Sequence, residues 1–450
     1  MRSIIKNVLL GVTLLTGFSF HAQSKRDLDN FRKPDQRGVN VFEDPKDTIS
    51  SFDELKVRVG GSFALQYQAL DHENFGSVNQ SDVLNQNGKY LSLVDLGSNF
   101  NLATANLDLD VALAEGVRMH LRTYLSSRHH PEPYVKGGYF QIDKLDFISK
   151  GLLSDFMKHA TIRIGHMENN YGDAHFRRSD NAQAIYNPFV GNLIMDAFTT
   201  EVGAEFYYRT ELGFLGMVGF SNGKLNQSTV KNDSDGASFL AKLGYDKQVS
   251  NNLRVRLTGS VYNTGSVTNS YLYSADRTGG RYYNVMDYNY NVYDADNDKN
   301  TVSSTDNFRS GRYNPNFGNK VTAFMINPFI KYKGLEFFGT IEMANGRRHS
   351  ETDRRNANQY AGELIYRFGQ NENFYVGGRY NLVSAEERTG EDVDIDRFNF
   401  AAGWFMTKNI LIKAEYVKQT YDGFTATSEL NRSLIDGKFN GAMVEAIISF

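Results

Sequence analysis

A period of two in the apolar residues constrains the fold of this chain more than any other feature of its sequence. In the final segment, 437–450, the apolar face consists of Ala442, Val444, Ala446, Ile448 and Phe450, and the opposite face carries Gly441, Glu445 and Ser449. Successive side chains of a strand point to opposite faces, so this period predicts a β-strand. An apolar stripe that ends in a bare aromatic residue is typical of a strand with lipid on one face and water on the other.

Similar alternation recurs along most of the chain. We predict sixteen strands near 56–68, 106–113, 117–125, 134–147, 160–167, 197–210, 214–222, 237–247, 252–264, 320–333, 335–345, 358–369, 373–385, 395–407, 409–421 and 438–450. Bacterial single-chain barrels have an even number of strands, with both termini on the periplasmic side. The sequence therefore predicts an all-β protein, a transmembrane antiparallel β-barrel of about 16 strands.

The connections between these runs alternate in length. Short links occur at 114–116, 249–251, 334, 370–372 and 408–409, and long links at about 70–98, 168–196, 265–319 and 422–437. Short periplasmic turns and long extracellular loops are typical of outer-membrane barrels. A solenoid would show a fixed repeat length, and a soluble sandwich gives no reason for this sorting.

The N-terminal region predicts export. Arg2 and Lys6 precede an apolar run from Val8 to Phe20, and a small residue, Ala22, stands at the expected cleavage site. The run is shorter than the roughly 18 residues that a membrane anchor needs, so residues 1–22 are interpreted as a signal peptide. Residues 23–54 are polar and predict a periplasmic N-terminal segment, and 55–450 form the barrel. The chain has no cysteine, and its net charge of −3 argues against a nucleic-acid partner.

One run changes its parity. Val321, Ala323 and Met325 share one face of the 320–333 run. Pro328, Ile330 and Tyr332 lie on the opposite face. A closed barrel has no edge for a proline, so this change predicts a β-bulge at Asn327-Pro328. A misplaced strand start is the alternative.

The face opposite the apolar stripe carries many charges of both signs. The predicted pore-lining residues are Arg118, His120, Arg122, Arg163, Arg254, Arg256, Arg367, Arg379, Asp108, Asp110, Glu201, Glu205, Glu336, Glu342, Glu363 and Glu415. Each poorly paired ion in a dry interior would cost several kcal/mol, so the pattern favours a water-filled channel in which some charges also pair.

The segment 165–181 is the densest functional candidate, because it follows a strand, lacks a period and gathers charged side chains. Its predicted constriction residues are His166, Asp173, His175, Arg177, Arg178 and Asp180. The apolar stretch 186–195 that follows predicts a loop folded into the barrel mouth, where rings of charge set selectivity. The alternative is an external loop packed on its neighbours.

Other constellations do not define a site. Asp294, Asp296 and Asp298 resemble the start of a calcium loop but lack its Gly and Glu. His129-His130 has no third ligand, and no Gly-x-Ser-x-Gly elbow is present, although separate strands could still assemble a lipase-like triad. The tyrosines of 265–319 could stack on sugars or pack the loop on itself. We predict no catalytic residue, no metal and no cofactor, and assign Trp404, Phe398 and Phe400 to an aromatic girdle.

The stretch RIGHMENNYGDAHFRRSDN at 163–181, together with the alternating strands and the terminal Phe450, resembles the phosphate-selective porin superfamily, closest to its Bacteroidetes-type members. The resemblance implies a sixteen-stranded, often trimeric channel, a constriction loop after the fifth strand and assembly through recognition of Phe450. Acidic residues interrupt the basic lumen, so general or weakly anion-selective passage is expected. The expected function is passive diffusion of small hydrophilic solutes and ions across the Gram-negative outer membrane, in contact with its lipid and lipopolysaccharide. The alternative is a barrel that acts as an enzyme or as a scaffold of a secretion or uptake assembly.

Overall fold

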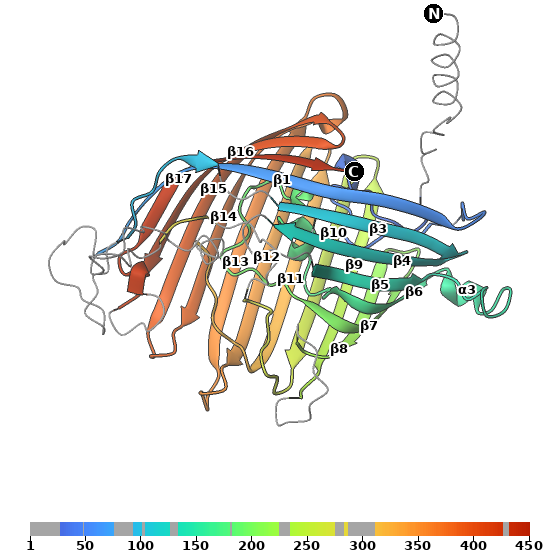
Figure 1. Ribbon diagram of the computed structural model, residues 1–450, viewed down its shortest axis with the longest axis horizontal. Helices are drawn as coiled ribbons and strands as arrows, with labels where there is room; N and C mark the ends of the chain where they lie inside the picture. Colours follow the sequence, from blue (N-terminus) through green and yellow to red (C-terminus); the bar gives the residue numbers. More distant parts are fainter. Residues whose placement is uncertain are drawn as a thin grey trace, which may run out of the picture.

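The alternating runs form one closed antiparallel barrel (Figure 1). The computed structural model describes residues 28–47, 49–75, 93–100, 104–126, 134–180, 182–224, 235–274, 283–286, 311–425 and 432–450. Its sixteen long strands are β1(Lys56–Glu73), β3(Thr104–Ala114), β4(Val117–Ser126), β5(Tyr134–Ile142), β6(Ala160–Glu168), β7(Thr200–Arg209), β8(Phe214–Ser221), β9(Ser238–Ser250), β10(Leu253–Thr264), β11(Lys320–Tyr332), β12(Leu335–Arg347), β13(Arg355–Phe368), β14(Phe374–Glu386), β15(Asp392–Thr407), β16(Ile410–Asp422) and β17(Lys438–Ser449). A two-residue strand, β2(Asn99–Phe100), pairs with β1.

The two ends of the sheet meet at β1. Residues Ser62–Glu73 of β1 pair with β17, and its first half, from Lys56 to Ala64, pairs with β3. Every other long strand pairs with its neighbour in sequence, so the sheet has no unpaired edge. The predicted all-β barrel of sixteen strands is confirmed, including the short strands β5 and β8.

The connections at one rim are short turns, with one exception. The β5–β6 link, residues 143–159, is long and contains the helical turn α3(Ser154–Met157), yet it lies at the rim of the short turns. The smaller 3-10 turns are η1(Gln36–Gly38), η2(Ala174–Arg177), η3(Ala184–Tyr186), η4(Gln370–Glu372) and η5(Arg432–Leu434).

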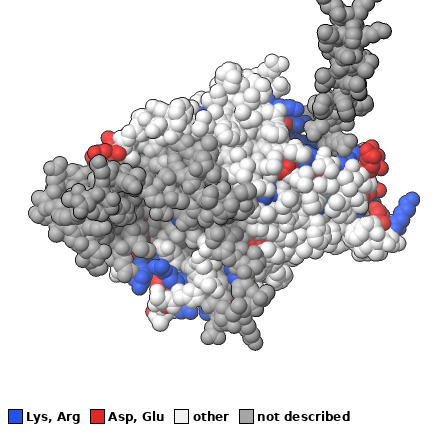
Figure 2. Space-filling view, in the orientation of Figure 1, with Lys and Arg blue, Asp and Glu red and all other residues white. Residues whose placement is uncertain are grey.

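The two faces of the wall differ as the alternation predicts. In β15, Phe398, Phe400 and Trp404 are exposed on the outside, whereas Arg397 and Asn399 are buried inside. Figure 2 shows few charged side chains on the described outer wall between its ends. Near the short-turn rim the outward rings of Tyr366, Phe368, Phe374 and Trp404 stack in a row with centroids 5.8–5.9 Å apart. Of the three residues predicted for an aromatic girdle, Trp404 belongs to this row, and Phe398 and Phe400 lie outside it.

The predicted bulge at Pro328 is wrong. The register of β11 against both neighbours is the same before and after Pro328. Asn327 replaces the missing proline donor, because its side-chain amide donates to the Gly339 carbonyl at 3.0 Å. The parity changes because Val321, Ala323 and Met325 face inward and belong to an apolar cluster inside the barrel. The inner wall is therefore not polar throughout.

Candidate functional site

A loop crosses the interior of the barrel between β6 and β7. This lumen loop, described over residues 169–180 and 182–199, turns backbone N–H groups to polar side chains of the wall. Gly172 donates to Ser260 (2.8 Å), Val190 to Glu415 (2.8 Å) and Ile194 to Asn381 (2.7 Å). Buried backbone donors need such acceptors, so these inward wall residues fix the path of the loop. The structure thus places the predicted constriction segment inside the barrel.

Most of the predicted constriction residues form hydrogen bonds or ion pairs within the lumen. Asp173 is fully buried and accepts hydrogen bonds from Arg256 (2.8 Å) and Thr258 (2.8 Å). His175 lies 2.6 Å from Glu168. The remaining pairs join Arg177 to Glu363 (3.1 Å) and Arg178 to Asp180 (3.1 Å) and Asp196 (2.7 Å).

His166 does not belong to the lumen loop. It lies in β6, on the parity of Ile162 and Ile164, and pairs in register with the outward residue Val202. The prediction of His166 as a constriction residue is therefore wrong, because β6 continues to Glu168 and an even position on it faces outward.

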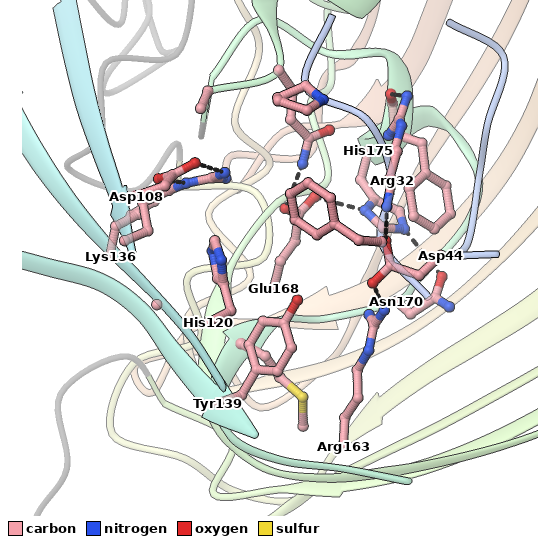
Figure 3. Close-up of a pocket in the computed structure, with 18 of the residues that line it drawn as sticks. Arg32, Asp44, Asp108, His120, Lys136, Tyr139, Arg163, Glu168, Asn170 and His175 are labelled. Carbon is pink, nitrogen blue, oxygen red and sulfur yellow. Dashed lines mark hydrogen bonds and ion pairs between the residues drawn. The ribbon is translucent and has the colours of Figure 1, made fainter. Parts of the chain in front are cut away.

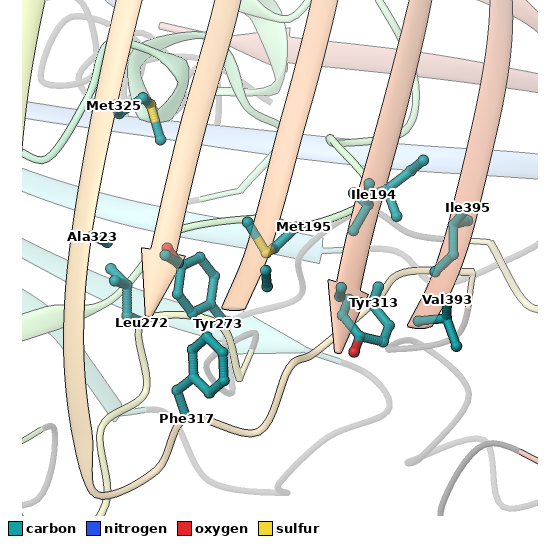
Figure 4. Close-up of a cluster of buried hydrophobic side chains, with 14 of the residues drawn as sticks. Ile194, Met195, Leu272, Tyr273, Tyr313, Phe317, Ala323, Met325, Val393 and Ile395 are labelled. Carbon is teal, nitrogen blue, oxygen red and sulfur yellow. The ribbon is translucent and has the colours of Figure 1, made fainter. Parts of the chain in front are cut away.

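A second segment fills the outer half of the lumen. Three of the four described tyrosines of the β10–β11 loop are buried against carboxylates: Tyr273 donates to Glu342 (2.7 Å), Tyr283 to Glu415 (2.6 Å) and Tyr313 to Glu387 (3.0 Å). Around them an apolar cluster includes Ile194 and Met195 of the lumen loop (Figure 4). These tyrosines pack the loop into the barrel. The Asp294–Asp298 and His129-His130 motifs lie outside the described residues.

The N-terminal segment, residues 28–47, also lies in the lumen, at the rim of the short turns. Asp44 pairs with both Arg118 and Arg163, and Glu43 lies 2.9 Å from Arg256. Phe42 packs its ring edge-on against Phe329 of β11, with centroids 5.4 Å apart. The sequence places this segment outside the barrel domain; its contacts show that it is part of the barrel interior.

Burial and neighbouring charge act in opposite directions on the two carboxylates of this segment. Burial alone would raise the pKa of Asp44, but the guanidinium groups of Arg118 and Arg163 lower it below its ordinary value of 3.8. In the same way, burial opposes Arg256 and Lys242 at Glu43, and the two cations hold its pKa below 4.5. Both side chains are therefore ionised when the segment is docked at neutral pH.

Between these parts a cavity of about 140 Å³ lies against the wall formed by β3 to β6 (Figure 3). Its charged lining comprises the cations Arg32, Arg118, Arg122, Lys136 and Arg163 and the carboxylates of Asp44, Asp108 and Glu168. His120 and His175 face the cavity from the wall and from the lumen loop. With five cations and three carboxylates, the lining has an excess of two positive charges when both histidines are neutral.

The predicted pore-lining residues all lie on the inner side of the wall, but only some reach this cavity. Arg118, His120, Arg122, Arg163 and Asp108 line it. Arg254 and Arg256 instead pair with Asp246 (2.7 and 3.0 Å), and Asp110 pairs with His120 (2.7 Å) and Arg58 (2.8 Å). Glu201 accepts a hydrogen bond from Tyr262 (2.9 Å), and Glu205 from Tyr207 and the Asn170 N–H (3.1 Å).

The other predicted inward residues also form ion pairs or hydrogen bonds inside the barrel. Glu336 pairs with Arg367 (2.8 Å), Glu363 with Arg379 (2.8 Å), and Glu342 and Glu415 hold loop tyrosines. Sequence reasoning missed Lys242 and Lys413, although both stand on the inward parity of their strands. It also missed Glu43 and Asp44, which no local pattern marks. The described residues contain no group of three or more His, Cys, Asp or Glu side chains that could hold a metal ion.

No model of a known protein family matches the chain, and no curated protein matches its sequence. Solved structures share its fold. OmpT, an outer membrane protein of Vibrio cholerae folded in vitro, is 11% identical, with a TM-score of 0.50 over 90% of this chain and 100% of that one. An anion-selective porin from Comamonas acidovorans is 11% identical, with a TM-score of 0.50 over 88% and 100%. A trimer form of the Vibrio protein is 10% identical, with a TM-score of 0.50 over 88% and 100%.

The fold determines where the protein resides. No helix in the described parts of the chain is long and apolar enough to cross a bilayer. In a closed antiparallel barrel each strand pairs with a neighbour on both sides, so its backbone groups bond within the wall, as lipid requires, and the outer face of this barrel is apolar. This architecture is that of outer-membrane proteins of Gram-negative bacteria, and the chain is one of them.

Proposed function

We propose that this chain is an outer-membrane channel for the passive diffusion of small hydrophilic solutes and ions, with a weak preference for anions. The observation that carries the proposal is the cavity along β3 to β6, whose charged lining has five cations and three carboxylates. A surplus of positive side chains at a constriction favours anions over cations. The apolar cluster closes much of the remaining lumen, so passage follows this wall.

Conductance and reversal potential in planar bilayers test the proposal. A pore gives discrete ohmic steps and, under a salt gradient, a reversal potential of anionic sign. Lys136 lines the cavity, and Asp180 is 4.0 Å from its ammonium group. Lys136→Gln should therefore shift the reversal potential toward cations, whereas Lys320→Gln, at the outer end of β11, should not. Equal reversal potentials for the two variants would contradict this route.

In this channel the arginines of the lumen loop hold the loop in place and do not select the ion. Arg177 and Arg178 are buried and paired, and neither lines the cavity. Reversing both charges would break buried ion pairs, so altered selectivity in that double variant would report misfolding rather than a selectivity filter.

Several finer assignments belong to the same proposal. Membership of the phosphate-selective porin superfamily, Bacteroidetes type, rests on the 163–181 stretch. A homotrimer is supported by that resemblance and by the trimer form of the Vibrio protein, and cross-linking in detergent tests it. N-terminal sequencing of the mature protein tests cleavage after Ala22.

A second candidate function has its own observation. The packed apolar interior of the outer half favours a barrel that acts as a scaffold of a larger assembly rather than as an open pore. Correctly folded protein that remains silent in bilayers would support this candidate and would contradict the channel.

A further inference from the structure

The β5–β6 link, residues 143–159, exposes more apolar surface than a turn in water should. This segment, called the finger below, presents Phe147 (53% exposed), Ile148 (64%), Leu152 (37%), Leu153 (58%) and Phe156 (43%). Exposed apolar side chains scattered singly are ordinary, but five large ones within ten residues mark a contact surface.

The base of the finger is fixed. The Asp143 N–H donates to the Gly116 carbonyl (2.6 Å), and its carboxylate accepts hydrogen bonds from Lys46 (2.9 Å) and Thr161 (2.7 Å). At the other end the Arg209 N–H donates to the His159 carbonyl (2.9 Å). Anchored at both ends, the finger holds its apolar side chains in a set direction.

The apolar surface of the finger continues the lipid-facing surface of the barrel. The Phe156 ring packs on Phe206 (6.0 Å between centroids) and on Tyr208 (5.6 Å), two residues on the outward parity of β7. The next turn of the same rim adds Leu212, which is 65% exposed. The outward face of β7 contacts lipid. Lipid therefore also reaches Phe156 and the side chains beside it.

We propose that the finger is a membrane-interface anchor that inserts Phe147, Ile148 and Leu153 into the periplasmic leaflet of the outer membrane. Its occupant is phospholipid. Three lysines stand among the apolar residues: Lys144 pairs with Glu115, Lys158 pairs with Asp155 at 2.6 Å, and Lys150 lies between Ile148 and Leu152. Aromatic residues at the headgroup level, with lysines reaching the phosphates, are the chemistry of interfacial anchors.

Tryptophan fluorescence with brominated lipids tests the proposal on the full chain. Trp404 is the only tryptophan, so Trp404→Phe provides a dark background. In that background Ile148→Trp is reconstituted in vesicles of phosphatidylethanolamine and phosphatidylglycerol with brominated acyl chains. Thr389→Trp, in an exposed turn at the other rim, is the aqueous control, and Trp404 of the unmodified chain is the lipid control.

The anchor predicts that bromine removes most of the emission of the Ile148→Trp variant, as it does for Trp404. The Thr389→Trp variant should keep its emission in brominated lipid and be quenched by iodide. Phe147→Trp repeats the measurement at a second position, in case one variant does not fold. Iodide quenching of the finger without bromine quenching would overturn the proposal. Protection from both quenchers that depends on the protein-to-lipid ratio would also overturn it, because a second copy would then be the occupant.

Discussion

Asp44 lies between Arg118 of β4 and Arg163 of β6, and so joins a segment near the N-terminus to the two strands that flank β5. Removing one partner of a buried ion pair costs far more than the pair contributes, because the remaining charge stays buried. Two guanidinium groups share this one carboxylate, and both also line the cavity. Asp44 therefore neutralises cations that would otherwise face a permeating ion.

This position gives a prediction for selectivity. Asp44→Asn keeps the shape of the side chain but removes its charge, so the cavity gains one net positive charge. We expect the reversal potential under a salt gradient to shift toward anions. Asp35→Asn is the matched control, since Asp35 pairs with the half-exposed Arg37 outside the cavity lining. Equal shifts in the two variants would show that Asp44 does not act through the cavity.

Gly191 shows how closely the two inward loops are packed. A Cβ built at this position would lie 2.1 Å from the hydroxyl of Tyr283, which is held by Glu415 at 2.6 Å. We expect Gly191→Ala to push Tyr283 away and to lower the free energy of unfolding by about 1–3 kcal/mol. Gly259→Ala is the control, because no atom lies within 4 Å of its Cβ. Urea unfolding of both variants in vesicles measures the difference, and equal stabilities would contradict close packing.

At the scale of elements, the strands could be predicted and the interior could not. A membrane strand carries its own signature, because its two faces meet different solvents. The position of the N-terminal segment depends on partners far away in sequence, such as Asn40 with Glu336 (2.6 Å). A contact between residues so far apart leaves no periodic pattern in the local sequence. The apolar stretch 186–195 did indicate a loop inside the barrel, since so apolar a segment needs a covered surface.

The docked N-terminal segment predicts a response to acid. The pKa values of Glu43 and Asp44 are lowered in the docked state, so docking has its full stability above their ordinary values of 4.5 and 3.8. That stability declines as the pH falls below these values and the carboxylates bind protons. We expect single-channel conductance to rise reversibly at about pH 3, as the segment leaves the lumen.

A variant that lacks residues 28–47 is the control for this response. It should show the higher conductance already at neutral pH and a much smaller change in acid, because other lumen carboxylates still titrate. If the full chain and the shortened chain have the same conductance at neutral pH, the segment does not obstruct the passage.

At the scale of the whole molecule, the alternation correctly predicted a closed barrel. The prediction that the whole inner face contacts water was wrong for part of the wall. Phe439, Met443 and Ile447 of β17 are fully buried and face inward, beneath the loops. The assumption that the inner face meets water holds at the cavity along β3 to β6. Elsewhere the inner face meets protein, so apolar residues occur on both sides of one strand. Period alone cannot distinguish these two environments.

Phe450 provides the last prediction, because closure and cellular assembly act on it through different atoms. Its backbone exchanges two hydrogen bonds with Gly61 of β1 (3.0 Å each), and its ring is 55% exposed on the outer face. Phe450→Ser keeps both backbone bonds, so folding into detergent micelles should proceed almost as in the unmodified chain. If the terminal ring is the assembly signal, the amount of this variant in the outer membrane of cells should fall several-fold. Ile448→Ser, which changes the same face two residues earlier, is the control. A loss in cells that is equal for both variants would assign the effect to lost lipid contact rather than to recognition of the terminal aromatic residue.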